Sequence, residues 1–179
     1  MARRRRSIET ALKQEIAPEC GILVALSGGR DSTVLLEALL RVQGLLKLRV
    51  EACHVDHGFR PSSAGDARFV AQFCSEREVP CRVERLGQKP ASANLEAWAR
   101  LQRYRVFREL LSERKLDWVV TAHTANDVAE TLLIKLLANK ELTTIERRDQ
   151  KRRCLRPLLD ISRAQITEYG DRHRVPFVD

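Results

Sequence analysis

The sequence predicts an α/β domain built around a parallel sheet. Apolar segments of strand length alternate with amphipathic segments of helix length, a pattern typical of strands joined by crossover helices. Residues 22–26 form an unbroken apolar run, as expected of a strand buried on both faces. A glycine turn at 27–29 then leads directly into a helix. We therefore expect a Rossmann-like fold of about five strands with helices on both faces.

Each element follows from a local pattern. A basic arm and a short amphipathic helix precede Pro18, so we assign residues 1–20 to a lead-in segment and 21–179 to the domain. Good N-caps for later helices are Ser62 or Ser63, Asn94 and Ser162. The expected strands are 22–26, 48–55, 80–86, 117–121 and 155–158. The expected helices are 7–15, 31–40, 63–74, 95–114, 126–138 and 163–173.

Two helices carry apolar stripes that predict their buried faces. Residues three and four apart lie on one side of a helix, so we expect such a stripe to pack on the sheet. In helix 95–114 the stripe is Leu95, Trp98, Leu101, Tyr104, Phe107 and Leu111. In helix 126–138 the stripe is Val128, Ala129, Leu132, Leu133 and Leu136.

Composition narrows the class of protein. With 179 residues, 44% of them apolar, the chain can bury a core and is too apolar for wholesale disorder, yet no stretch approaches a membrane span. Its five cysteines form no C-x-x-C pair, which is typical of free thiols in a reducing compartment, so we expect a cytoplasmic protein. The net charge of +8 indicates a polyanionic partner such as nucleic acid, or an arginine-rich proteome, and composition does not decide between them. The cysteines are Cys20, Cys53, Cys74, Cys81 and Cys154.

The turn Ser27-Gly28-Gly29 predicts an anion site. Glycine has no Cβ, so a ligand can approach the backbone closely. The helix that opens at Asp31 and Ser32 aims N–H groups and a positive dipole end at the same point, where phosphate is the usual occupant. The lysine and spacing of a Walker A loop are absent. An ordinary tight turn is the alternative, but six fixed positions after a buried strand favour nucleotide binding.

Two further polar clusters follow strands, at the edge of the sheet where such folds bind ligands. Residues 54–60 read His-Val-Asp-His-Gly-Phe-Arg, a weak metal pattern for which structural histidines are the alternative. Residues 121–131 place Asp127 and Glu130 three apart on one face of a helix start. This pair could hold Mg²⁺ or a cationic amine, or simply complement the helix dipole. His123, at the same strand end, favours a functional role.

Five segments, in order along the chain, carry a family signature. They are S-G-G-R-D-S, H-V-D-H-G-F-R, N-L-E-A-W-A-R-L-Q-R-Y, T-A-H-T-A-N-D-V-A-E-T-L-L and R-P-L-L-D-I-S-R-A-Q-I. Together they resemble the tRNA(Ile)-lysidine synthetases, which are PP-loop ATP pyrophosphatases with the adenine nucleotide alpha hydrolase fold. The resemblance runs from about Gly21 to Asp179. Other PP-loop families share the first segment, whereas the second and third point to this one.

The resemblance implies a two-step ligation that uses ATP and Mg²⁺. ATP would adenylate the C2 oxygen of the wobble cytidine in tRNA(Ile) with a CAU anticodon, and free L-lysine would then displace AMP. The family pattern leaves the oligomeric state open, with a homodimer as one option, and involves no membrane. The nucleotide would bind Ser27, Gly28, Gly29, Arg30, Asp31, Ser32 and His54, with Asp31 near the metal. The catalytic residues would be Asp31, Arg103, His123, Asp127 and Glu130, with Arg100 as the alternative to Arg103.

Three departures from the family pattern bear on this expectation. The family often has His-His-x-Asp-Asp where residues 123–127 read His-Thr-Ala-Asn-Asp, and Asn126 cannot act as a base. The charged segment 139–153 replaces a glycine-rich stretch, and basic residues in and after it could grip phosphates. The family continues beyond the position of Asp179, so a C-terminally truncated fragment, a reduced enzyme and a decayed copy all stay open. The basic residues are Arg147, Arg148, Lys151, Arg152, Arg153 and Arg156.

Two other functions compete with the ligase. A PP-loop tRNA 2-thiolase shares ATP activation but needs sulfur-carrying cysteines, and the absence of C-x-x-C argues against it. A non-catalytic module that binds tRNA or nucleotide is favoured if the chain lacks a C-terminal part that catalysis requires.

Overall fold

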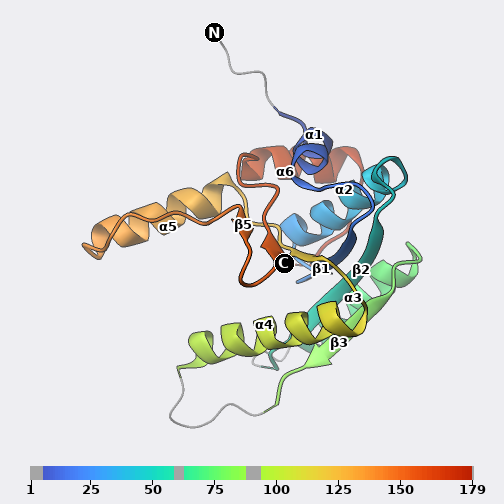
Figure 1. Cartoon of the computed structure of the whole chain (residues 1–179), viewed down its shortest axis with the longest axis horizontal. Coiled ribbons are helices and arrows are strands. Elements are labelled where there is room, and N and C mark those ends of the chain that lie inside the picture. The colour runs from blue at the N-terminus through green and yellow to red at the C-terminus, as the bar shows by residue number, and fades with distance from the viewer. Residues whose placement is uncertain (1–5, 59–62, 88–93, 179) are drawn as a thin grey trace.

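The first strand occupies the centre of the sheet. A computed structural model describes residues 6–58, 63–87 and 94–178. Within these residues the strands form one six-stranded sheet in the order β3-β2-β1-β4-β6-β5 (Figure 1). Neighbouring strands pair in parallel, apart from the antiparallel pair β5 and β6. The strands are β1 (Gly21–Ala25), β2 (Arg49–Asp56), β3 (Cys81–Arg85), β4 (Trp118–Val120), β5 (Arg148–Asp149) and β6 (Cys154–Leu155).

The predicted parallel α/β fold is confirmed, and two details at one sheet edge differ from the prediction. Strand β5 was not predicted, because two residues inside a charged segment are too few to show an alternating pattern. Strand β6 covers Cys154–Leu155 rather than residues 155–158. Pro157 has no backbone N–H to donate to a ladder, so the pairing ends before it.

Helices cover both faces of the sheet, as predicted. Ile22 and Val24 of β1 belong to one hydrophobic cluster and Leu23 to another, because alternate strand residues point to opposite faces. Helices α1, α2, α3 and α6 contribute to the first cluster and α4 to the second. Figure 1 shows α1, α2 and α6 on one side and α4 on the other. The helices are α1 (Ile8–Glu15), α2 (Arg30–Leu46), α3 (Ser63–Ser75), α4 (Leu95–Glu113), α5 (Ala125–Leu137) and α6 (Arg163–Arg172).

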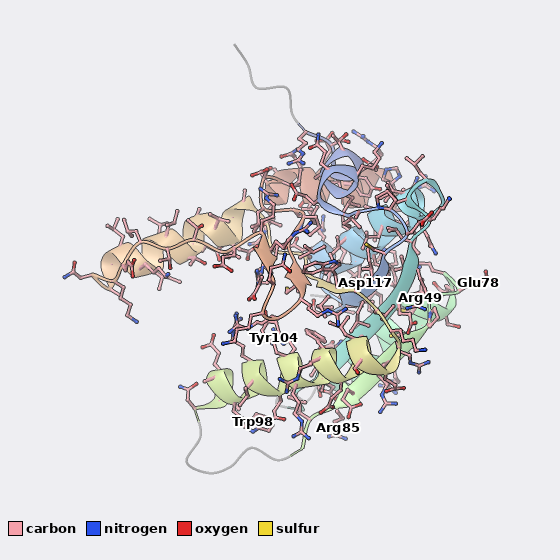
Figure 2. The ribbon with its side chains drawn as sticks, viewed as in Figure 1. Arg49, Glu78, Arg85, Trp98, Tyr104 and Asp117 are labelled. Carbon is pink, nitrogen blue, oxygen red and sulfur yellow. The ribbon has the colours of Figure 1, made fainter. Side chains whose placement is uncertain are left out.

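The stripe predicted for α4 is buried only in its second half. Phe107 and Leu111 are buried, whereas Leu95 and Leu101 are 43% and 67% exposed. Figure 2 shows Tyr104 on the sheet side of α4 and Trp98 on the other side. The first half of the helix borders cavities instead of the sheet, so apolar spacing there does not lead to burial.

The buried face predicted for α5 is wrong. No residue of this helix is buried in the structure, and Figure 1 shows the helix extending away from the sheet. Four of its large apolar side chains are between 58% and 86% exposed, and Leu132 is half-buried. Helical spacing of apolar residues marks a face that favours burial, but it does not show that a partner element is present. The exposed residues are Leu133, Ile134, Leu136 and Leu137.

The strand order creates a crevice beside β1. The chain passes from β1 to β2 on one side of the sheet and later enters β4 on the other side of β1. At such a topological switch point the loops after the strands diverge and leave room for a ligand. The three polar clusters of the sequence all follow strands at this edge. None of the described helices is long and apolar enough to cross a membrane.

Candidate active site

A cavity of about 500 Å³ lies at the carboxyl ends of β1, β2 and β4. All three predicted clusters contribute to its wall. An adjoining cavity of about 380 Å³ is lined by Gly29, Arg30 and residues of α6. Gly28 and Glu130 line neither cavity. The predicted site residues in the main cavity are Ser27, Asp31, Ser32, His54, Arg103, His123 and Asp127.

The glycine turn is held by hydrogen bonds within itself. The Ser32 hydroxyl donates to the Gly29 carbonyl oxygen at 2.9 Å, and the Ser27 backbone N–H donates to the Ser32 hydroxyl at 3.2 Å. Gly28 has a φ of +92°, and a Cβ there would lie 3.0 Å from Cγ2 of Val178. The N-cap of α2 is Gly29, which has no side chain to bond the first-turn N–H groups. These donors can therefore serve an anion.

Two carboxylates approach each other across the main cavity. Burial raises the pKa of Asp31, the neighbouring charge of Asp127 raises it further, and Arg163 opposes both. Asp127 also closes a capping box, because its Oδ2 accepts from the Thr124 backbone N–H at 2.6 Å and from the Thr124 hydroxyl at 2.8 Å. The predicted dipole role of Asp127 and its place in the cavity are thus both present. Glu130 is exposed and lies 4.0 Å from Arg163.

The carboxylates fit a divalent cation. Burial, and to a lesser degree the charge of Asp127, raise the pKa of the half-buried Asp31, so a cation there would stabilise its charged form. Among the residues that the structure describes, no group of three or more His, Cys, Asp or Glu side chains forms a complete metal site. A metal at Asp31 would therefore need ligands beyond the protein, as Mg²⁺ finds in phosphate oxygens.

The histidines of the cavity differ in their partners. His54 is buried, and its Nδ1 lies 2.9 Å from the Leu26 carbonyl oxygen, to which it donates. The Nδ1 of His123 lies 2.8 Å from the Thr121 hydroxyl. Burial lowers the pKa of His123, and nearby Arg156 lowers it further. His123 is therefore a neutral imidazole at pH 7, able to accept a proton.

The structure distinguishes the two candidate arginines of α4. Arg103 is half-buried, and its Nη2 lies 3.1 Å from Nε2 of His57. Arg100 is exposed, and its guanidinium lies 5.2 Å from the centre of the Tyr104 ring. A guanidinium fixed by a hydrogen bond loses less freedom on meeting an anion. Arg103 is therefore the better-placed cation of the pair.

Arg163, at the first position of α6, was missed by the sequence analysis as a site residue. Its Nε lies 3.9 Å from Oδ2 of Asp31, so it joins the glycine turn to the start of α5. Asn126 accepts a hydrogen bond from the Arg163 backbone N–H at 2.9 Å. The departure at Asn126 thus has a structural use. The only sequence signal for Arg163 was its place in the last of the five segments.

Most of the basic residues around segment 139–153 have partners inside the protein. Arg147 pairs with Glu15 and Asp160, and Arg152 pairs with Asp149. Three more of the six donate to backbone carbonyl oxygens. A phosphate held by these groups would have to replace existing bonds. The residues that donate to backbone are Arg148, Arg153 and Arg156.

The chain is similar to known proteins over nearly its whole length. A model of the PP-loop domain matches residues 2–179. The tRNA(Ile)-lysidine synthase of Zymomonas mobilis is 35% identical over 96% of the chain. The tRNA(Ile)-lysidine synthase of Gloeobacter violaceus is 38% identical over 90% of the chain. The chain spans about half the length of these curated relatives, 53% and 50%. The tRNA(Ile)-lysidine synthase of Deinococcus radiodurans is 39% identical over 88% of the chain, which covers 27% of that relative.

Two solved structures share the fold at low sequence identity. The U34-tRNA thiolase NcsA from Methanococcus maripaludis aligns with a TM-score of 0.77 over 96% of this chain and 64% of its own, at 16% identity. A glutamine-dependent NAD+ synthetase from Acinetobacter baumannii aligns with a TM-score of 0.59 over 92% of this chain and 30% of its own, also at 16% identity. At this identity the likeness concerns the fold alone.

Proposed function

Because the chain belongs to the PP-loop domain family, we propose that it is the nucleotide-binding and catalytic part of a tRNA(Ile)-lysidine synthase. The reaction joins L-lysine to C2 of the wobble cytidine of tRNA(Ile) with a CAU anticodon, and converts ATP into AMP and pyrophosphate. The observation that carries this proposal is the main cavity, where the glycine turn, two carboxylates, a neutral histidine and a fixed arginine converge. The similarity to curated lysidine synthases supports the substrate assignment.

In the first step the cytidine C2 oxygen attacks the α-phosphate of ATP, and the bond to pyrophosphate breaks. The N–H groups of the glycine turn, with Ser27 and Ser32, would hold the phosphates. Asp31 would hold Mg²⁺, which supplies charge neutralisation on the phosphate oxygens when bound. The guanidinium of Arg103 would stabilise the negative charge that develops at the reaction centre.

In the second step the lysine amine attacks C2, and AMP leaves with the oxygen that it captured. The amine must lose a proton as the new carbon–nitrogen bond forms. His123 is neutral and lines the cavity, so it could accept that proton. The free oxygen of Asp127 would bind the attacking amine inside the cavity, while Glu130, outside the cavity, would bind the other amino group of lysine as an ammonium.

The cysteines favour lysine transfer over sulfur transfer. Cys53 lines the main cavity, but burial raises the pKa of its thiol to about 12. A thiol with that pKa stays protonated at pH 7 and is a poor nucleophile. A tRNA 2-thiolase needs sulfur-carrying cysteines, so the thiolase stays the second choice. A tRNA partner accords with the net charge of +8, and a cytoplasmic setting accords with the five free cysteines.

One assay distinguishes the three functions. The chain is incubated with ATP, radiolabelled lysine and tRNA(Ile) bearing CAU, and label in RNA is counted. The same tRNA with its wobble cytidine replaced by uridine is the matched control and should take up no label. No incorporation, under conditions where a full-length lysidine synthase is active, would contradict the ligase. Pyrophosphate release that depends on a sulfur donor would support the thiolase, and tight tRNA binding without product would support the binding module.

A further inference from the structure

His57 and Arg103 meet where the end of β2 faces the middle of α4. His57 follows the last residue of β2, and Arg103 projects from the first half of α4, the part that borders cavities. Their contact joins Nη2 of the guanidinium to Nε2 of the imidazole at 3.1 Å, and both side chains are half-buried. The contact spans 46 residues of sequence, so tertiary structure alone brings the pair together.

The chemistry of this contact assigns the state of His57. A guanidinium can only donate hydrogen bonds, so Nε2 must accept and the imidazole proton must sit on Nδ1. His57 is therefore neutral when the contact is made. The charges around it agree: burial lowers the pKa of His57, and Arg103 and His54 lower it further, against the smaller opposing effect of Asp56.

Arg103 lies between two cavities. It lines the main cavity and also a neighbouring cavity of about 410 Å³, whose other walls include Asn94, Leu95 and Glu96. The flexible side chain of Arg103 can turn into either cavity, and in the neighbouring cavity it would point toward the carboxylate of Glu96. His57 lines both cavities too, and its acceptor fixes the guanidinium at the boundary.

We infer that His57 is a positioning residue, which holds the guanidinium of Arg103 toward the main cavity by accepting its hydrogen bond. This inference rests on the proposed function, because it concerns how Arg103 is placed for the first step. His57 acts through Arg103 and does not itself exchange a proton with substrate. Loss of the acceptor frees the guanidinium to turn toward Glu96, and the transition state then loses the cation proposed to stabilise it.

The pairing itself can be measured without tRNA or lysine. Nitrogen-15 NMR of the histidine side chains should show His57 neutral at pH 7, with Nε2 unprotonated. In Arg103→Met the pKa of His57 should rise, because a neighbouring positive charge is removed. An Nε2-protonated tautomer, or a pKa unchanged in Arg103→Met, would overturn the pairing. This measurement stands whether or not lysine transfer is detected, so it separates failure of the pairing from failure of the proposed function.

The positioning role is tested by a double-mutant cycle in the lysine-transfer assay. His57→Leu should lower kcat by roughly tenfold to a hundredfold, with little change in the KM for ATP, since small misplacement of a catalytic group has effects of that size. His57→Gln keeps an acceptor and should recover most of the rate. In the Arg103→Met background, His57→Leu should cost less than about twofold, because coupled residues are not additive.

Two outcomes of the cycle oppose the inference. If the effects of His57→Leu and Arg103→Met multiply, His57 acts independently of Arg103. If His57→Gln is as slow as His57→Leu while both have wild-type thermal stability, the acceptor is not what matters. His173→Leu is the matched histidine control and should keep the wild-type rate. The His173 ring lies tilted against the Tyr169 ring, with 4.3 Å between the ring centres, and His173 does not line the main cavity.

Discussion

The two walls of the main cavity are built in different ways. The wall that carries the glycine turn belongs to α2, a helix with nine buried residues. The wall that carries Asp127 belongs to α5, in which no residue is buried. Both helices begin at the same edge of the sheet, yet α2 lies on the core for its whole length and α5 leaves it. Figure 1 shows the contrast directly.

The hydrogen bonds that fix the α5 wall of the cavity lie in the first turn of the helix. Thr124 is fully buried and exchanges hydrogen bonds with Asp127 in the capping box. The Ala125 backbone N–H donates to the Ile161 carbonyl oxygen at 2.9 Å, and Asn126 bonds the Arg163 backbone. A helix can therefore hold a site residue in place through its first turn, even when the rest of the helix is exposed. The later turns of α5 need not be buried to place Asp127, whereas the turn at Gly28 depends on the core beneath it.

The largest expected effect lies on the α5 wall, at Asp127. Asp127→Asn keeps the shape of the side chain and an oxygen that can close the capping box, so the fold should survive. It removes the negative charge proposed to bind the amine, and lysine transfer should fall by at least about a hundredfold, the usual cost of one essential electrostatic group. ATP binding should stay within a few-fold of wild type. The measurements are lysine incorporation and ATP affinity.

Glu130→Gln is the matched comparison for Asp127→Asn. Glu130 lies outside the cavity, so its loss should reduce lysine transfer by less than the loss at Asp127. Equal losses at both positions would mean that the exposed and the half-buried carboxylate act as one unit. A normal turnover of Asp127→Asn would remove that carboxylate from the proposed mechanism.

The next effect concerns the other wall, at Gly28. Gly28→Ala places a Cβ in the left-handed region and 3.0 Å from Val178, at a cost of about 1–3 kcal/mol for the backbone strain alone. We expect at least tenfold weaker ATP binding and a lower midpoint of thermal unfolding. Gly44→Ala, in α2 with no atom within 4 Å of its new Cβ, is the control. It should stabilise the helix slightly, and equal effects of the two changes would refute a special role for the turn.

The same contrast explains how far the sequence predicted the structure. The parallel sheet, the glycine turn and the caps at Asn94 and Ser162 follow from local patterns, and the structure has them. The fate of Leu133 did not follow, because spacing identifies an apolar face but not a partner for it. The contacts of His57 and Arg163 did not follow either, since each joins segments that lie far apart in the sequence. Local chemistry is readable from sequence, while pairing across the cavity depends on the fold.

The two walls should respond to pH with opposite sign. Burial lowers the pKa of His123 below its ordinary 6.5, so protons favour the unfolded chain and stability should fall as pH drops through that region. Burial raises the pKa of Asp31, so the folded protein binds a proton there more readily than the unfolded chain. The contribution of this group to the free energy of unfolding therefore increases as the pH falls. The free energy of unfolding, measured by urea between pH 7.5 and 5.5, should decrease by up to about 1 kcal/mol per pH unit from one such histidine.

Matched variants assign the pH dependence. His123→Gln should flatten the decrease in unfolding free energy below pH 6.5, because the titrating group is gone. Asp31→Asn should stabilise the protein near neutral pH, since it removes a half-buried charge that both its burial and Asp127 disfavour. An unchanged slope in His123→Gln would place the titration on other groups, His57 first among them.

The smallest expected effect tests whether α5 stands apart from the core. Leu133 is 58% exposed, so Leu133→Ala should change the free energy of unfolding by no more than about 0.5 kcal/mol, as surface substitutions usually do. Leu39, fully buried in α2, is the matched control, and Leu39→Ala should cost about 2–5 kcal/mol. Urea denaturation of the two variants measures both. A cost above about 1 kcal/mol at Leu133 is outside the range of a free surface residue. It would mean that α5 buries its apolar face against a partner in solution. Both walls would then rest on buried helices and would differ only in what covers them.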